Sequence, residues 1–340
     1  MNLLLSDEQT QIVDSLKVFL RDRAPVSRFR PPAPQIGNAD HALWPQLAEL
    51  GFLGISLPEG QGGIGFTAAE EMLAYREFGR HLLSPGILGM TLGAQLSARA
   101  GSDFLAELLQ GRMSVALANP RGPAKLGAEC SGEFHLFDAE QAALVLACDE
   151  TGSALLRRQD FTAVRNVLGT DHVLGLERAL LTGVRPAVWI DGASAALYPR
   201  AQLLLAAYAV GIAEATRDMA VEYAKSRQQF GKPIGSFQAV KHICADMAIR
   251  AEAALCQVFF AAVVQSEQRA GQEFHSIAAR LVAVDAALKN AAQNIQVHGA
   301  IGFTAEADAH LFLKRSHVIE QFWGDTRQQR RQMLAAPFPD

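Results

Sequence analysis

The sequence contains few aromatic residues, few cysteines and no cluster of basic residues. Aromatic side chains make up 7% of the 340 residues, and alanine-rich stretches dominate, which is typical of a helical scaffold. The 4 cysteines form neither a CxxC pair nor another metal-site spacing, so we expect reduced thiols and no metal site. With a net charge of −4 and no basic tract, nucleic acid is not an expected partner.

Long apolar runs and a secretion signal are also missing. No uninterrupted apolar stretch approaches the roughly 20 residues that span a bilayer. The first residues, MNLLL, have no basic start and lead at once into a polar helical segment. We therefore expect a cytoplasmic protein without a membrane partner. Hydrophobic residues make up 49% of the chain, which is enough to bury more than one domain core.

The hydrophobic pattern predicts a mostly α protein with a small β domain. We expect an N-terminal helical domain over 1–112, a shortened β-sandwich or barrel-like domain over 113–192, and a C-terminal four-helix bundle over 193–340. Capping boxes at Ser6–Gln9 and Thr67–Glu70 predict helices over 6–23 and 67–80. Strands are predicted at Ser114–Leu117, Glu133–Phe137, Ala142–Ala147, Ala163–Leu168, Arg178–Leu181 and Ala187–Ile190.

The stretch that organises the chain is SRQQFGKPIGSFQ, at Ser226–Gln238. It separates two long segments of helical periodicity, so it predicts a helical hairpin with Arg227 and Phe230 at its turn. An arginine, an aromatic ring and a glutamine at a helix end are able to hold a phosphate and a heterocycle. A plain helix cap with a docked aromatic ring is the alternative interpretation of this stretch alone.

Two further stretches follow in a specific order. QVHGAIGF, at 296–303, ends another predicted helix, over Phe274–Val297, and HLFLKRSHVIEQFWGDTRQQR occupies His310–Arg330. Together the three stretches resemble the C-terminal helical domain of the acyl-CoA dehydrogenase family. The family pattern is R-x-x-F-G-x-x-I followed by F/H-Q, then Q-x-x-G-G-x-G-F, and then x-E-G-T-x-x-x-x-R. The glycine-rich segment at 51–65 also resembles the N-terminal domain of that family, and it is a poor match to a dinucleotide fold.

The resemblance implies an FAD held between two subunits, with several side chains of this chain at its adenylate and pyrophosphate end. Arg227 would pair with the pyrophosphate, Phe230 would pack on the cofactor, and Gln238 would follow as in the family. The other matching positions are Gln296, Gly299, Ala300, Thr326 and Gln328.

The other half of such a site departs from the family pattern. The loop that holds the flavin ring in the family matches VALANPRGP at 115–123, which has no serine or threonine. The family's catalytic glutamate would fall on Gly324, and its alternative position on Ala201. Asp325 or Glu320 could act as a shifted base, but we expect Asp325 to cap the helix that starts at Thr326.

Histidines suggest no metal centre. His298 replaces an apolar or aromatic residue of the family motif. Two roles for it are open: a contact to a ribose or phosphate, or that of an interface histidine whose hydrogen bonds are satisfied. His310 and His317 lie seven positions apart without other ligands around them.

The combined pattern predicts no catalytic residue on this chain. We expect a subunit of a hetero-oligomeric acyl-CoA dehydrogenase, of α2β2 type, whose related partner chain carries the base, with an electron-transfer flavoprotein as acceptor. Acyl-CoA would be the substrate. Two alternatives remain: a self-sufficient homodimeric dehydrogenase with a non-standard base, and a scaffold that has lost FAD.

Overall fold

The computed structural model describes residues 5–31, 40–192 and 197–338. Its contacts divide the chain into two compact units. The first comprises Met1–Ala33, Met72–Leu82 and Gln202–Asp340, and the second comprises Pro34–Glu71 and Leu83–Ala201. Helices α3 (Ala68–Arg80) and α6 (Leu197–Ser226) each run from one unit into the other. Residues 32–39, within a proline-rich stretch of the sequence, lie outside the described residues.

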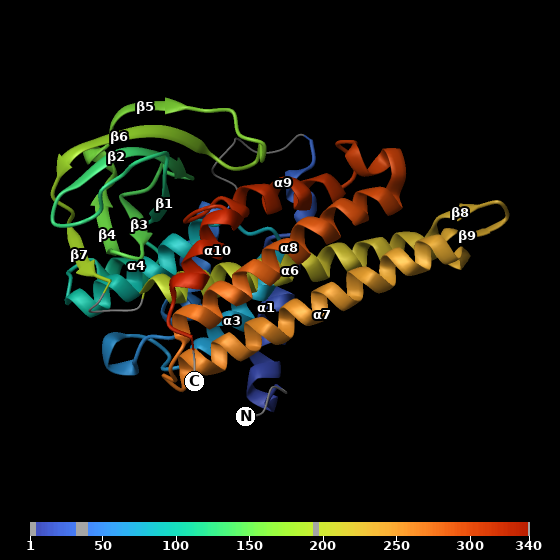
Figure 1. The fold of residues 1–340 in the computed structure, drawn as a ribbon, viewed down its shortest axis with the longest axis horizontal. Coiled ribbons are helices and arrows are strands. Elements are labelled where there is room, and N and C mark those ends of the chain that lie inside the picture. Colours follow the sequence, from blue (N-terminus) through green and yellow to red (C-terminus); the bar gives the residue numbers. More distant parts are fainter. Residues whose placement is uncertain (1–4, 32–39, 193–196, 339–340) are drawn as a thin grey trace. The chain divides into compact units, whose positions relative to one another are not determined.

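The first unit is helical (Figure 1). Helix α1 begins with the predicted capping box, in which Ser6 and Gln9 exchange hydrogen bonds. The long helices α7 and α8 run antiparallel to each other, and α8 also packs against α9 and α10. The helices of this unit besides α3 and α6 are α1 (Asp7–Arg23), α7 (Gln238–Ser266), α8 (Gln272–His298), α9 (Ala309–Glu320) and α10 (Thr326–Ala335).

Within the first unit, α3 and α6 cross in close contact because each has a glycine at the crossing. A Cβ atom on Gly79 would lie 1.9 Å from the carbonyl oxygen of Tyr208, and one on Gly211 would lie 1.9 Å from that of Arg76. Arg76 then donates to Glu214 through Nε at 2.7 Å and Nη2 at 2.8 Å. The two glycines and this bidentate ion pair fix the crossing.

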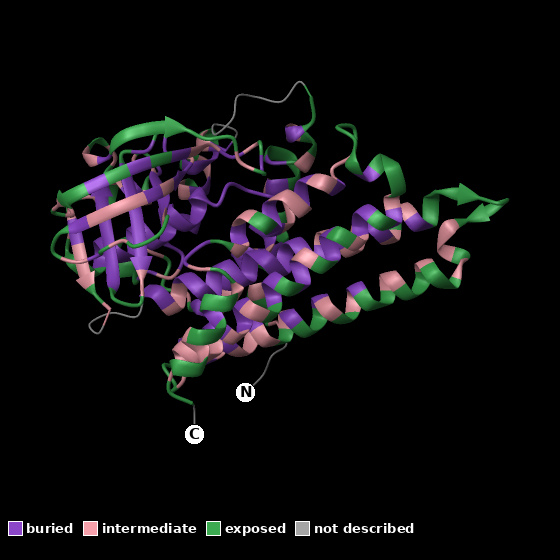
Figure 2. Ribbon diagram, turned by 45° about the horizontal axis from the view of Figure 1, so that its top comes forward, coloured by how far each residue is buried: buried purple, intermediate pink, exposed green. Residues whose placement is uncertain are grey.

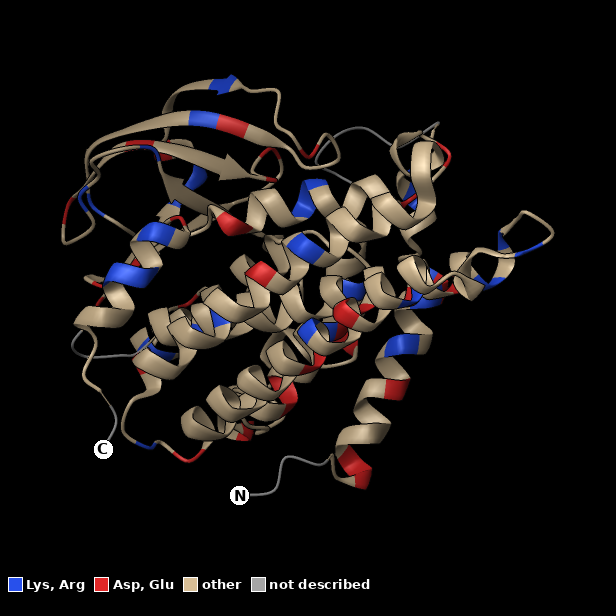
Figure 3. Cartoon of the chain, turned by 45° about the vertical axis from the view of Figure 1, so that its right-hand side comes forward, with Lys and Arg blue, Asp and Glu red and all other residues tan. Residues whose placement is uncertain are grey.

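Helix α7 is unusually apolar, because Lys241, Asp246, Arg250 and Glu252 are its only charged residues; Figure 3 marks the charged residues of the chain. Among the described helices it alone is long and apolar enough to cross a bilayer, by length and composition only. It buries Met247, Ala251, Ala254 and Val258, and it packs along α8, as a core helix does. Its outer face remains exposed at Ile249, at 67% (Figure 2).

The second unit contains one seven-stranded sheet in the order β5-β6-β2-β1-β3-β4-β7. All neighbours are antiparallel except β1 and β3, which are parallel. A core of Ala, Leu, Val and Phe side chains lies on one side, including Phe134 and Leu156. The strands are β1 (Val115–Pro120), β2 (Cys130–Phe137), β3 (Leu144–Asp149), β4 (Gly152–Arg157), β5 (Thr162–Asn166), β6 (Leu176–Val184) and β7 (Val188–Asp191).

Helices of the second unit also follow the predicted pattern. Glu70 accepts from the main-chain NH of Thr67 at 2.8 Å, which confirms the second capping box. The described helices wholly within this unit are α2 (Trp44–Glu49), α4 (Gly86–Ala100) and α5 (Leu105–Leu109). The mostly α fold with a β middle region is therefore confirmed, and six of the strands match predicted ones. Strand β4 was not predicted.

Candidate functional site

The connection between α6 and α7 is a short arm that ends the helical bundle (Figure 1). Two-residue strands, β8 (Gln228–Gln229) and β9 (Lys232–Pro233), pair across it. The tip is Phe230 and Gly231, both with positive φ, at 51° and 77°. Phe230 is 91% exposed. The predicted helical hairpin is confirmed, whereas the strand pair within it was not predicted.

Arg227 occupies the base of this arm. It follows the last turn of α6, where its NH donates to the carbonyl of Tyr223 at 2.8 Å. Its side chain is exposed and has no ion pair within the described part of the chain. Gln238 is exposed at the first position of α7. A guanidinium without a protein partner can bind a phosphate or pyrophosphate in bidentate fashion.

The C-terminal end of α8 lies against the same end of α6. The rings of His298 and Tyr223 stack with centroids 4.2 Å apart, and the Nδ1 of His298 lies 2.8 Å from the carbonyl oxygen of Asn294. These two contacts hold the His298 ring in place within the chain. Gln296 is exposed in the last turn of α8. Gly299 caps this helix with a φ of 67°, and the next residue, Ala300, is exposed.

Thr326 and Gln328 lie elsewhere, at the start of α10. The hydroxyl of Thr326 donates to Glu320 at 3.0 Å. The adjoining Gly324 is bonded to Arg280, in the N-terminal half of α8. Arg280 and Gln296 are 16 positions apart on that helix, which corresponds to about 24 Å along its axis. Within one chain, the predicted cofactor residues therefore form two separate groups.

The segment that carries the base in the predicted motif is a fixed corner between α9 and α10. Arg280, 2% exposed, donates through Nη2 to the carbonyl oxygens of Glu320 at 3.2 Å, Phe322, and Gly324 at 2.8 Å. Its Nη1 donates to Gln202 at 2.7 Å. Arg280 was missed from the sequence, although a charged residue within the apolar stripe of Ile277, Leu281 and Val284 was a signal.

No carboxylate stands at either expected base position. Gly324 has a φ of 103°, and a Cβ atom there would lie 2.7 Å from the side-chain amide of Gln328. Ala201 is fully buried. The side chain of Asp325 accepts from the NH of Gln328 at 2.7 Å, so the predicted role of Asp325 as a helix cap is confirmed.

The strand that matches the family's ring-binding loop offers no hydroxyl. β1 is paired on both sides, with β2 and β3, and its residues 115–118 are buried. Asn119 and Pro120 are only half buried. The residues of this chain thus fit the anionic tail of a dinucleotide at the arm, and they do not fit its ring at β1.

Comparison with known proteins identifies the relationship. The model of the acyl-CoA dehydrogenase N-terminal domain matches residues 6–110, and that of the C-terminal domain matches residues 197–336. Acyl-CoA dehydrogenase IpdE2 of Mycobacterium tuberculosis is 34% identical over 86% of this chain and 86% of its own length. The chain belongs to the acyl-CoA dehydrogenase family. This confirms the predicted enzyme class and its flavin cofactor, FAD.

One relative is longer than this chain, and two solved structures have the same fold. Acyl-CoA dehydrogenase FadE34 of Mycobacterium tuberculosis is 35% identical over 88% of this chain, but the match spans only 43% of FadE34. Among solved structures, the ChsE4–ChsE5 complex from Mycobacterium tuberculosis has a TM-score of 0.85 at 22% identity and covers 98% of both chains. Butyryl-CoA dehydrogenase from Megasphaera elsdenii has a TM-score of 0.83 at 21% identity, covering 98% of this chain and 99% of its own. These likenesses confirm the fold.

Proposed function

We propose that this chain is the base-lacking subunit of a hetero-oligomeric acyl-CoA dehydrogenase. It supplies the adenylate and pyrophosphate half of an FAD site between subunits, and a related partner chain supplies the catalytic glutamate. The observation that carries the proposal is the contrast between Gly324 and Arg227. Gly324 has no side chain where the base belongs, with Gln328 packed against that point, whereas Arg227 is exposed and unpaired among the described residues.

The arm has the chemistry for its part of the site. Arg227 would hold the pyrophosphate, and Phe230, exposed at the tip, would lie against the cofactor. Gln238, Gln296, Gly299 and Ala300 would contact the adenylate end. FAD held by these residues would supply a hydride acceptor for the β-carbon of an acyl thioester. An electron-transfer flavoprotein would then receive the electrons.

The two nearby carboxylates argue against a self-sufficient enzyme. Asp325 is engaged in capping α10, and Glu320 accepts a hydrogen bond from the hydroxyl of Thr326. A base must also lie within about 3 Å of the proton that it removes. Two relatives support a mixed assembly: ChsE4–ChsE5 is a complex of two chains, and FadE34 is long enough to contain a second unit of this size.

The test is to purify the chain alone and together with the acyl-CoA dehydrogenase-like chain encoded nearest to it. We expect colourless protein alone, and yellow protein that oxidises acyl thioesters when the two are co-expressed. A panel of fatty, branched, aromatic and steroid side-chain thioesters would identify the acyl group. Yellow, active protein from the single chain would overturn the proposal in favour of a homodimeric enzyme. Colourless protein in every pairing would favour a scaffold without FAD.

A further inference from the structure

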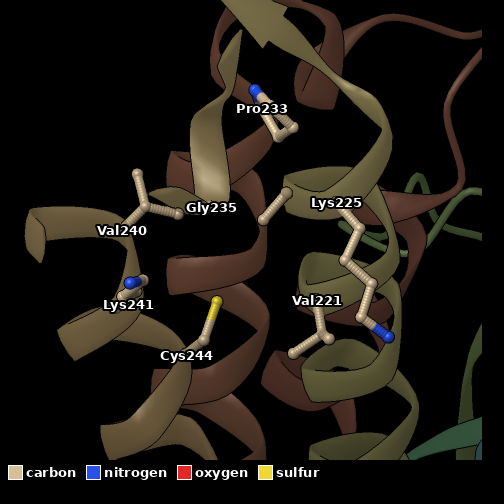
Figure 4. Close-up of a pocket in the computed structure, with 8 residues that line it drawn as sticks. Val221, Lys225, Pro233, Gly235, Val240, Lys241 and Cys244 are labelled. Carbon is tan, nitrogen blue, oxygen red and sulfur yellow. The ribbon is translucent and has the colours of Figure 1, made fainter. Parts of the chain in front are cut away.

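The arm also carries an apolar groove, which opens between α6 and α7 (Figure 4). Its volume is about 370 Å³, within the range of roughly 300–1,000 Å³ that is typical of small-molecule sites. Its walls are aliphatic or sulfur-containing side chains, namely Val221, Ala224, Pro233, Val240 and Cys244.

This groove borders the candidate cofactor residues. Val221 and Lys225 are one helical turn apart on α6 and line the groove. Tyr223, which stacks on His298 of α8, packs in the same side-chain cluster as Ala224, Val240 and Cys244 of the groove. The groove is therefore next to the surface around His298 and Gly299.

Two lysines give the apolar groove a cationic edge. Lys225 comes from α6 and Lys241 from α7, and both are exposed. The ammonium of Lys225 is shared with Glu222 at 2.8 Å, whereas Lys241 has no ion pair within the described ranges. No acidic residue lines the groove itself. An apolar cavity with a cation from each wall favours a ligand that is apolar at one end and anionic at the other.

We propose that the groove binds an amphipathic carboxylate or related anion, with its hydrocarbon chain between α6 and α7 and its anionic head at Lys225 and Lys241. A free fatty carboxylate has this chemistry directly, whereas an acyl-CoA thioester carries its negative charge on its phosphates, far from the thioester. The groove borders the cofactor residues of the arm, so its ligand is measured directly and not through retention of FAD, and the two proposals can fail separately.

Cys244 provides a reporter inside the groove, and Cys256, exposed on the same helix, provides the control. The chain is treated with N-ethylmaleimide in the presence of decanoate, decanoyl-CoA or uncharged 1-decanol, each below its micelle concentration, and each cysteine is followed by mass spectrometry. We expect decanoate to slow modification of Cys244 at least fivefold and to leave Cys256 unchanged, with little effect of 1-decanol. Protection by decanoyl-CoA alone would identify the thioester as the source.

Charge reversal tests the lysines directly. The K225E/K241E double variant should weaken decanoate binding, measured by calorimetry, at least tenfold. K289E is the matched control, because Lys289 is an exposed lysine on α8. Equal binding by both variants, or equal protection by decanoate and 1-decanol, would overturn the proposal. Protection of Cys244 that follows protein concentration or partner binding, without any ligand, would also overturn it and make the groove an interface between chains.

Discussion

The guanidinium of Arg280 donates to the main-chain carbonyl of Gly324 at 2.8 Å. The donor lies on α8 and the acceptor lies in the corner between α9 and α10. Arg280 also bonds the carbonyls of Glu320 and Phe322, and Gln329 donates to that of Trp323 at 2.7 Å. The corner in which the motif places the base is therefore tied to α8 and α10 through its main chain.

Replacing Arg280 with methionine should destabilise the protein strongly. The substitution leaves three main-chain oxygens without their donor, and each buried unsatisfied group costs about 1–3 kcal/mol. We expect the free energy of unfolding, measured with urea, to fall by about 3 kcal/mol or more. K289M, on the exposed face of the same helix, should change it by less than about 0.5 kcal/mol. Equal effects of the two substitutions would show that the bonds to the corner contribute little.

Asp325 should matter for stability and not for turnover. Its carboxylate caps α10, so D325A should cost about 1 kcal/mol of stability, whereas D325S, which retains a capping oxygen, should recover most of that loss. In the assembled enzyme, neither variant should change kcat more than a few-fold. A thousandfold loss of kcat in D325A and D325S alike would give Asp325 the catalytic role.

Arg227 should determine how tightly the assembled enzyme retains FAD. Hydrogen bonds to a charged group contribute about 1.5–3 kcal/mol, so R227A should weaken FAD binding by about tenfold to a hundredfold. R227K should be intermediate, because an ammonium lacks the planar fork of the guanidinium. R23A removes another exposed arginine, in the last turn of α1, and serves as the control. The measurement is fluorescence of FAD released on dilution, and unchanged retention in R227A would contradict the assignment.

Gly324 should resist substitution because of its backbone conformation. G324A places a side chain at a φ of 103°, which residues other than glycine rarely adopt. The Gln328 amide lies 2.7 Å from the added methyl group, but it ends an exposed, flexible side chain and can turn aside. We expect a loss of about 1–2 kcal/mol, nearly the same in a Q328A background. A much smaller loss in that background, measured by thermal unfolding, would show that Gln328 resists displacement.

Stability should also fall in mild acid because of His81. Burial lowers the pKa of this imidazole to about 4 from its usual value of 6.5. Between these two pH values, His81 therefore binds a proton in the unfolded chain and remains neutral in the folded chain. The stabilisation is complete above pH 6.5, and about 3 kcal/mol of it is lost as the pH falls from 6.5 to 4. H81Q removes the titration, so its free energy of unfolding should vary less over this pH range, and an unchanged slope would refute the interpretation.

The sequence predicted most helices because their signals are local. Capping residues such as Ser6 and Asp325 act within one turn, and the periodicity of α8 extends over its whole length. Strand β4, with the sequence GSALLR at Gly152–Arg157, lacks β-branched residues and alternation, so no local signal marked it. It forms because β3 and β7 pair with it on both sides.

The candidate site was predictable only in part for a similar reason. The motif identified residues one by one, and the structure separates them: Arg227 and Gln296 lie at one end of the bundle, and Thr326 and Gln328 lie beside Arg280. That separation follows from the antiparallel course of α8 and α9, which no motif spacing contains. Arg280 itself bonds residues 40 or more positions away, beyond the range of any sequence pattern. The assignment of the individual cofactor residues remains a prediction.

Main-chain oxygens are common to all twenty amino acids, and the printed bonds of Arg280 at the corner are to such oxygens. Its grip on the corner therefore does not depend on which side chains stand at positions 320 and 322. Under the proposed division of labour between subunits, such a corner is able to keep its course without carrying a base.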